Sequence, residues 1–321
     1  MSELIYVASI ARSLENTLLG SEKITRMVFA ESYEDALKIL AESGFGNMSE
    51  GGVDAMIAAE ELKLARFMKE AEGIKGLESF ALRNDYHNAK ALMKAKYAGI
   101  EDASFMLAPA GTLEVDALKD AVMNDEYGAL PDLMAKALAE IDAAFASAPR
   151  SGRHIDEVLD KAMYAHVLAV SKKARSIEKY WRIEIDYANT QIFLRLRKSG
   201  GSERGFKDAF ISGGEIGIDV FLPLMEETDE TVIEKLSYTC VGRGIREYAP
   251  LKSFARFEAC KDDEQLEIFK KDRYDLFGVA PVAGYYVAKK SELKAVKMIT
   301  TLLKIGAEKA LIKERLREFY V

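Results

Sequence analysis

The sequence predicts an all-α protein. Only six prolines occur in 321 residues, and long stretches repeat apolar residues at the helical period. The chain shows no run of alternating Val, Ile, Thr and aromatic residues bounded by hairpin turns, which would indicate strands. The length is enough for one large domain or two to three ordinary ones.

The helices can be placed in chain order. Ser32-x-x-Asp35 and Thr231-x-x-Glu234 resemble capping boxes, so we expect helices to begin there. Apolar residues at helical spacing predict further helices over 53–70, 133–145, 155–177 and from Leu293 towards the C-terminus, with an interruption at Gly306. Glycine-containing loops are expected at 44–52, 73–76, 98–111, 148–152, 199–214 and 278–284.

One motif occurs about three times. It consists of an acidic residue, usually an asparagine three positions later, and a glycine fourteen positions after the acid. The copies are Asp85, Asn88 and Gly99; Asp186, Asn189 and Gly200; and Glu292, Ala295 and Gly306. They begin 101 and 106 residues apart, which predicts a domain-sized unit used three times. We therefore expect three helical repeat units, over 1–110, 111–213 and 214–321.

The motif fits one face of a helix. Positions 0, 3, 7, 10 and 14 share a face and form an apolar stripe that ends in glycine. An acid near a helix N-terminus suits the helix dipole, and a glycine after the last apolar residue indicates the C-terminus. The first two copies also carry basic residues at positions 9 and 11, which are Lys94, Lys96, Arg195 and Arg197.

The motif allows a functional and a structural interpretation. The acid and the asparagine could be ligands or catalytic groups, or they could be caps or a buried polar link between neighbouring helices. Active sites are seldom kept in triplicate on one chain, whereas each copy of a unit needs its packing device. The third copy also replaces asparagine by Ala295 without losing the apolar stripe. We therefore predict a structural motif.

Composition and charge exclude several classes of protein. Hydrophobic residues make up 49% and charged residues 30% of the chain, which is typical of a globular protein with ample core material. No apolar run approaches the roughly 18–20 residues that span a bilayer, so no direct membrane span is expected. Cys240 and Cys260 do not make a disulfide framework, and reduced cytosolic thiols are the default.

The distribution of charge disfavours a nucleic-acid binder. The net charge is −7, with 45 basic and 52 acidic residues, whereas nucleic-acid binders usually carry a basic surplus. The C-terminal segment is locally basic, with nine Lys and Arg against four Glu from Lys289 onward. A basic amphipathic helix can meet a membrane surface or an acidic partner, although such charges are more often the solvated face of an ordinary helix.

No pattern in the sequence indicates catalysis. The three histidines, His87, His154 and His166, are not paired at metal-ligand spacing. The chain also lacks a Walker-type phosphate loop and a Gly-x-Ser-x-Gly elbow. The sequence therefore predicts no catalytic residue, no bound cofactor and no metal site.

The chain resembles a known family along most of its length. It is similar to the C subunit of the bacterial and archaeal V-type (A-type) ATP synthase, a relative of the d subunit of the eukaryotic V-ATPase. The matching features are Tyr6-Val7-Ala8, Ala11-Arg12, the Asp-x-x-Asn helices at Asp85 and Asp186, Ser212-Gly213-Gly214-Glu215-Ile216, Pro281-x-x-Gly284-Tyr285, Lys290-x-Glu292 and Lys297-x-Ile299. Ala295 and Lys297 stand where the family commonly has Asn and Arg.

The resemblance implies a fold and a role. The family fold is three similar helical units around a pseudo-threefold axis, forming a funnel. The family member has no catalytic role and sits between the membrane rotor ring and the central shaft built by the D and F subunits, where it passes torque during proton or sodium ion transport. ATP is bound by other chains. The implied location is cytoplasmic, peripheral on the inner face of the cell membrane through the rotor ring.

Two alternatives from other classes remain at this stage. One is a helical-repeat scaffold that binds peptides or unrelated proteins. The other is an all-helical enzyme whose site lies in the funnel. Co-location of the gene with the genes of other ATP-synthase subunits would separate the family role from both.

Overall fold

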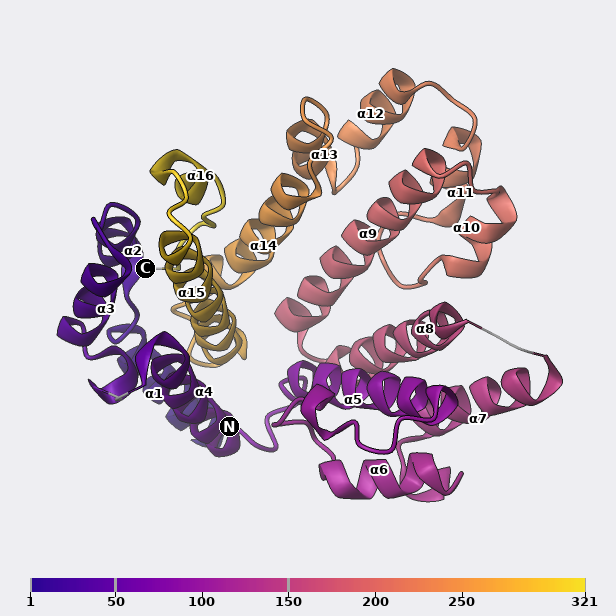
Figure 1. Ribbon diagram of the computed structural model, residues 1–321, viewed down its shortest axis with the longest axis horizontal. Helices are drawn as coiled ribbons and strands as arrows, with labels where there is room; N and C mark the ends of the chain where they lie inside the picture. Colours follow the sequence, from indigo (N-terminus) through magenta and orange to yellow (C-terminus); the bar gives the residue numbers. More distant parts are fainter. Residues whose placement is uncertain (1, 49–50, 149–150, 321) are drawn as a thin grey trace. The chain divides into compact units, whose positions relative to one another are not determined.

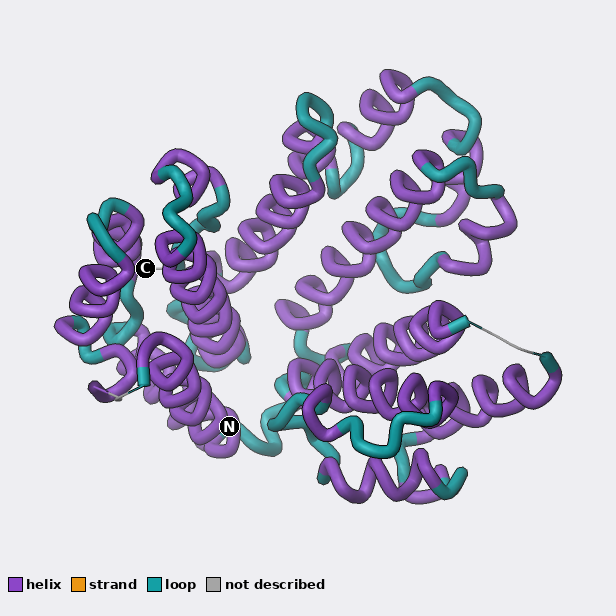
Figure 2. Tube along the Cα trace, viewed as in Figure 1, coloured by secondary structure: helices purple, strands orange, loops and turns teal. Residues whose placement is uncertain are grey.

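The computed structural model describes residues 2–48, 51–148 and 151–320. Within these ranges the chain consists of helices joined by turns and loops, without a strand (Figure 2). The predicted all-α class is therefore confirmed. Parts of the expected loops at 44–52 and 148–152 lie outside the described residues.

The helices form two compact units. The terminal unit joins residues 1–74 to residues 242–321, and the central unit contains residues 75–241. The terminal unit contains α1 (Ser2–Glu15), α2 (Gly20–Val28), α3 (Tyr33–Glu42), η1 (Phe45–Met48), α4 (Gly52–Glu70), α13 (Gly242–Tyr248), α14 (Phe254–Lys271), α15 (Ala280–Lys304) and α16 (Lys309–Glu314). The division into three repeat units stays a prediction.

The central unit holds the first two copies of the motif. Its elements are α5 (Glu78–Ala98), η2 (Ser104–Met106), α6 (Val115–Met123), η3 (Tyr127–Ala129), α7 (Asp132–Ser147), α8 (Gly152–Ser171), α9 (Arg175–Lys198), α10 (Glu203–Ala209), α11 (Ile218–Phe221), η4 (Leu222–Leu224) and α12 (Asp229–Ser237). Helix α5 packs on α6 and α8, and α8 packs on α7 and α9 (Figure 1). Trp181 of α9 is 1% exposed and donates its indole N–H to Ser79 Oγ of α5 at 2.8 Å.

The terminal unit buries the third copy of the motif among N-terminal helices. Helix α15 packs on α1, α2, α3 and α4, so the indigo and yellow ends of the chain share one core (Figure 1). Ile24 and Leu40 from the start of the chain belong to the same apolar cluster as Leu293, Val296 and Ile299 of α15. Burial of these side chains in a common core ties the two ends of the chain together.

The three motif helices pack on neighbours from different parts of the chain. Helix α5 packs on α6 and α8, which follow it in the sequence, whereas α9 packs on α8 before it and on α10 after it. Helix α15 packs on α1, α2, α3 and α4 as well as on its sequence neighbours α14 and α16. The third motif helix therefore takes most of its neighbours from the N-terminal segment.

The three motif glycines end their helices in the same way. Gly99, Gly200 and Gly306 have φ of 68°, 70° and 70°, the left-handed region that suits glycine. The N–H of the next residue donates to the carbonyl five residues earlier, at 2.9 Å for Ile100 to Ala95, 2.8 Å for Gly201 to Leu196 and 2.9 Å for Ala307 to Leu302. This is the Schellman pattern of helix termination, as the sequence predicts.

Two expected helix starts have different outcomes. The N-cap at Ser32 is confirmed, because its hydroxyl accepts the N–H of Asp35 at 3.1 Å. The expected cap at Thr231 is wrong: the cap is Thr228, whose hydroxyl accepts the N–H of Thr231 at 3.3 Å. The helix begins at Asp229, directly after Thr228, and carries Asp229 and Glu230 in its first turn, where acids are favourable.

Three other expectations differ from the structure. The expected loop at 199–214 contains the helix α10. The expected helix over 155–177 is divided, because α8 ends at Ser171 and α9 begins at Arg175. The expected loop at 278–284 is helical from Ala280 onward, with Pro281 in the first turn of α15. Proline is tolerated there because the first N–H groups of a helix have no partner within it.

Gly200→Ala should lower the free energy of unfolding by about 1 kcal/mol, because alanine is strained at positive φ. No neighbouring atom lies within 4 Å of the added Cβ, so the effect is that of the backbone alone. Gly205→Ala, within α10, should instead stabilise the protein by up to about 1 kcal/mol. Urea titration of both variants measures these changes. The expectation is contradicted if both substitutions shift the free energy of unfolding in the same direction.

Candidate functional site

The first copy of the motif holds a loop by its backbone. Asp85 is fully buried, in the middle of α5. Its carboxylate accepts the N–H of Thr112 at 2.9 Å, the N–H of Leu113 at 3.1 Å and the hydroxyl of Thr112 at 2.7 Å. These bonds satisfy a charge that burial would otherwise make costly.

The asparagine holds the same loop four residues earlier. Asn88 donates its side-chain N–H to the carbonyl of Ala108 at 2.9 Å, and its side-chain oxygen accepts the N–H of Ala108 at 2.7 Å. The side-chain amide thus pairs with both polar groups of one backbone residue. An apolar side chain at this position would leave both groups without these bonds.

The second copy repeats the arrangement. Asp186 accepts the N–H groups of Glu215 and Ile216, each at 2.9 Å. Asn189 donates to the carbonyl of Ile211 at 2.7 Å and accepts its N–H at 2.9 Å. The Cys240 thiol also donates to Asp186, at a sulfur–oxygen distance of 3.3 Å. We call this pairing of an acid and an asparagine with a loop backbone the clamp.

The spacing within the clamped segment is the same in both copies, although the loops differ. The first loop contains η2 and the second contains α10. Counted from the motif acid, the clamped residues of the second copy lie two positions farther along the sequence than those of the first. The segments themselves, 108–113 and 211–216, are bound at corresponding positions. The loop can therefore vary in length, whereas the clamped six residues keep their register.

A glycine lets the backbone approach each carboxylate. A Cβ added at Gly111 would lie 2.0 Å from Asp85 Oδ1, and one added at Gly214 would lie 2.1 Å from Asp186 Oδ1. Both distances are far shorter than a non-bonded contact allows. The glycines that precede the bound N–H groups are therefore part of the clamp, because any other residue would push the segment away.

The third copy reaches a segment from the other end of the chain. Glu292 of α15 accepts the N–H of Leu19, just before α2. Its second oxygen accepts the ammonium of Lys289 at 2.6 Å, and Lys289 also pairs with Glu60 at 2.6 Å. The segment before Leu19 has no glycine. Glutamate is one methylene longer than aspartate, and from α15 it reaches the amide of Leu19.

The position of the missing asparagine is occupied differently. Ala295 lines a small cavity together with Phe319 and Tyr320 from the C-terminal tail. The tail is bound by another acid, because Asp263 of α14 accepts the N–H of Glu318 at 2.8 Å. The tail thus lies beside the third motif helix and needs no asparagine to hold it.

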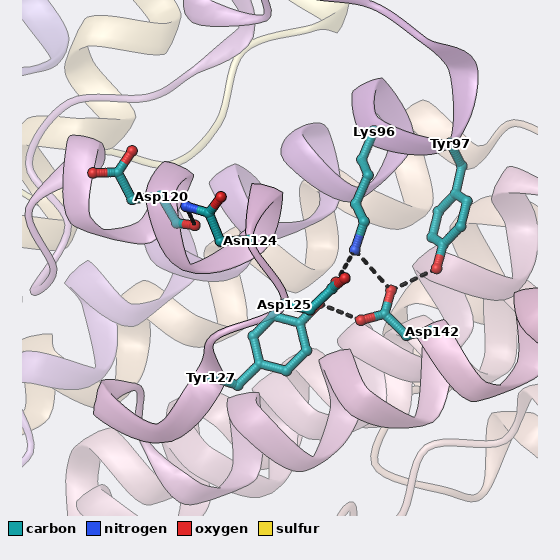
Figure 3. Close-up of polar contacts among 7 residues, drawn as sticks. All are labelled: Lys96, Tyr97, Asp120, Asn124, Asp125, Tyr127 and Asp142. Atoms are coloured by element: carbon teal, nitrogen blue, oxygen red, sulfur yellow. Dashed lines mark hydrogen bonds and ion pairs between the residues drawn. The ribbon is translucent and has the colours of Figure 1, made fainter.

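The basic residue at position 11 fastens each of the first two motif helices to the segment that follows. Lys96 donates to Asp142 of α7 at 3.0 Å and to Asp125, and the hydroxyls of Tyr97 and Tyr127 also donate to Asp142 (Figure 3). A hydrogen bond joins Asn124 to the carbonyl of Asp120 within the same turn (Figure 3). The cluster lies just beyond the C-terminus of α6, where a cation is favourable.

The equivalent basic residue of the second copy binds backbone carbonyls. Arg197 donates to the carbonyls of Leu224, Met225 and Glu227. The third copy has Leu303 at this position, and Lys309 instead donates to the carbonyl of Ala30, just after α2. In all three copies, a cation therefore binds a residue just after the first helix or turn that follows the clamped segment.

Burial dominates the ionisation of the clamp acids. It raises the pKa of Asp85, Asp186 and Glu292, while the hydrogen bonds and, for Glu292, the Lys289 ammonium act in the opposite direction. For Lys96, burial alone would lower the pKa, but the bonds to Asp125 and Asp142 raise it above its ordinary value.

The structure changes the local interpretation of the motif. The acids do not lie at helix N-termini: α5, α9 and α15 begin 7, 11 and 12 residues earlier. The acid and the asparagine bind loop backbone rather than a neighbouring helix. We infer that the motif is a structural clamp, and that Gly111, Gly214 and the basic residues at position 11 belong to it.

The comparisons with known proteins identify the family. The profile of the family described as ATP synthase (C/AC39) subunit matches residues 7–315. The chain is 26% identical to the C subunit of the V-type ATP synthase of Thermus thermophilus, covering 97% of this chain and 98% of that protein. It is 24% identical to the C subunit of the A-type ATP synthase of Methanocaldococcus jannaschii, covering 92% and 81%.

The chain therefore belongs to the ATP synthase (C/AC39) subunit family. The family provides a structural, non-catalytic subunit of the V-type and A-type complexes, so the alternative of an all-helical enzyme does not hold. Within the described residues, no helix is both long and apolar enough to cross a membrane.

Asn189→Leu should lower the free energy of unfolding by about 1–3 kcal/mol, because it leaves both polar groups of Ile211 without their partners. Asn124→Leu is the control, since Asn124 is exposed and bonds within its own turn; a change within about 0.5 kcal/mol is expected there. Denaturant unfolding measures both. A normally stable Asn189→Leu variant that loses partner binding would show that Asn189 is a docking residue.

Gly214→Ala should destabilise the protein by about 1–3 kcal/mol, because its Cβ would collide with the Asp186 carboxylate. The same change should cost less in an Asp186→Ala background, where the carboxylate is absent. A double-mutant cycle of unfolding free energies measures this coupling. Strictly additive effects would show that Gly214 is required for some reason other than close approach to Asp186.

Proposed function

We propose that this chain joins the membrane rotor ring to the central shaft of D and F subunits in a rotary V-type or A-type ATP synthase. It would transmit torque between them during proton or sodium ion transport, while other chains bind ATP. Its location would be cytoplasmic, at the inner face of the membrane through the rotor ring. Membership of the subunit family supports this proposal.

The observation that carries the mechanical role is the repeated fastening of the motif helices. In each of the first two copies, a Schellman turn, a two-residue clamp and a basic side chain bind the helix to the segment that follows it. Buried hydrogen bonds with fixed geometry resist relative movement of the parts they join. A part that transmits torque needs this stiffness and needs no reactive side chain.

Contacts between corresponding positions support three similar units about a pseudo-threefold axis. Arg83 of α5 pairs with Glu184 of α9 at 2.8 Å, and both residues stand two positions before their motif acids. Arg83 also lies over the Trp181 ring, 5.1 Å from its centre. Contact between equivalent positions is the relation expected of helices that face a common axis.

Omission of this chain from a reconstituted complex tests the proposal. The catalytic head should still hydrolyse ATP, while ATP-driven ion pumping into vesicles stops, because the shaft is no longer joined to the ring. The isolated chain should neither bind nor hydrolyse ATP. Ion pumping that persists without the chain, or ATP turnover by the purified chain, would refute the coupling role.

A further inference from the structure

The nine lysines and arginines from Lys289 onward make different kinds of contact. Lys289 pairs with Glu60 and Glu292, Lys290 with Glu61 at 3.7 Å, and Arg317 with Asp262 at 3.2 Å. Lys309 donates to the carbonyl of Ala30, and Lys304 lies over the Tyr33 ring. These contacts account for five of the nine within the terminal unit.

Three of the remaining cations line one groove. Lys294 and Lys297 stand on the exposed face of α15, and Arg315 follows α16. With Met298, Thr301 and Leu302 they border an open groove of about 320 Å³. Across the described ranges, none of the three cations forms an ion pair with a carboxylate, and no acidic residue lines the groove.

Two acids close to Arg315 in the sequence, Glu314 and Glu318, are engaged elsewhere. Glu314 pairs with Arg256 at 2.7 Å, and Glu318 pairs with Arg243 at 3.2 Å. The protein carries a net charge of −7, so a groove with three cations and no carboxylate is a local reversal of sign. The three cations repel one another, and an anionic partner would be attracted to all three and would offset that repulsion.

The apolar residues at the base of the groove indicate which kind of partner it binds. Met298 is half-buried and Leu302 is buried at its base, so an occupant with apolar side chains gains from covering them. Methionine adapts to varied apolar partners. A segment of polypeptide can present carboxylates and apolar side chains together, whereas lipid headgroups present charge alone at the membrane surface.

We propose that this groove binds an acidic, partly apolar segment of another subunit of the complex. Its carboxylates pair with Lys294, Lys297 and Arg315, and an apolar side chain covers Met298 and Leu302. The inference rests on the proposed function, because it assumes that the chain is part of a rotary complex. It adds to that function the surface and the chemistry of one contact with another subunit.

Site-specific crosslinking in the assembled complex identifies the occupant. A photoreactive benzoylphenylalanine in place of Thr301, which is exposed in the groove, should crosslink to a peptide of another subunit in which acidic residues outnumber basic ones. Crosslinks to lipid, to this chain itself, or to a peptide without an acidic surplus would overturn the inference, as would an assembled complex that gives no crosslink.

Charge reversal supplies a second test. The triple variant Lys294→Glu, Lys297→Glu, Arg315→Glu should bind the purified D–F pair or the detergent-solubilised rotor ring about tenfold more weakly or worse, with a smaller dependence on salt. Lys173→Glu, Lys198→Glu, Lys235→Glu is the control, because it makes the same charge change at exposed lysines of the central unit.

The outcomes distinguish the two proposals. Equal binding by the two triple variants to both the D–F pair and the ring would overturn the groove assignment. If the groove variant does not fold, as judged by thermal unfolding, the Thr301 crosslink decides. If the groove is not a docking site, the proposed coupling role still stands, because that role is tested separately by omitting the whole chain from the reconstituted complex.

Discussion

The hydrogen bonds between a buried carboxylate and the backbone of a returning loop organise this fold. A helix packed only through apolar contacts can slide or rotate by small amounts, because dispersion forces have little directionality. Asp85 and Asp186 remove this freedom, since each accepts two adjacent backbone N–H groups at 2.9–3.1 Å. The asparagine one turn later fixes the same segment at a second point, and two points define an orientation.

The differences between the copies follow from how the returning segment is supplied. Two copies have a continuous loop that returns to the helix, and they use aspartate, asparagine and a closely approaching glycine. In the third copy, Glu292 instead accepts the N–H of Leu19 before α2, and Lys289 balances the charge of Glu292. The C-terminal tail lies beside Ala295 and is bound by Asp263. The departures from the motif thus coincide with different partners for the third helix.

The sequence predicted the features that depend on local pattern. The glycines end their helices because the turn needs a positive φ that glycine adopts without strain. The burial of Leu92, Phe193 and Ile299 in the stripe follows from its helical period. The resemblance to the family was visible in short motifs spread along most of the chain, and the comparisons bear it out.

The features that depend on distant parts of the chain could not be predicted. Nothing in the neighbourhood of Glu292 indicates that its partner is Leu19, because the bond joins residues 273 positions apart. The same holds for Lys289 and Glu60. The motif acids lie inside their helices rather than at the N-termini, because α5, α9 and α15 begin 7, 11 and 12 residues earlier. The basic residues at position 11 were visible, but their partners, Asp142 and the carbonyl of Met225, follow only from the packing.

Native-state hydrogen exchange at the clamped amides tests the central claim most directly. The N–H groups of Ala108, Thr112, Leu113, Ile211, Glu215 and Ile216 lie in loops, yet they should exchange as slowly as amides in the buried parts of α5 and α9, because the clamp must open before they exchange. Asp186→Asn should speed exchange at Glu215 and Ile216 while Thr112 and Leu113 stay protected. Rapid exchange of these amides in the unaltered protein would contradict the account.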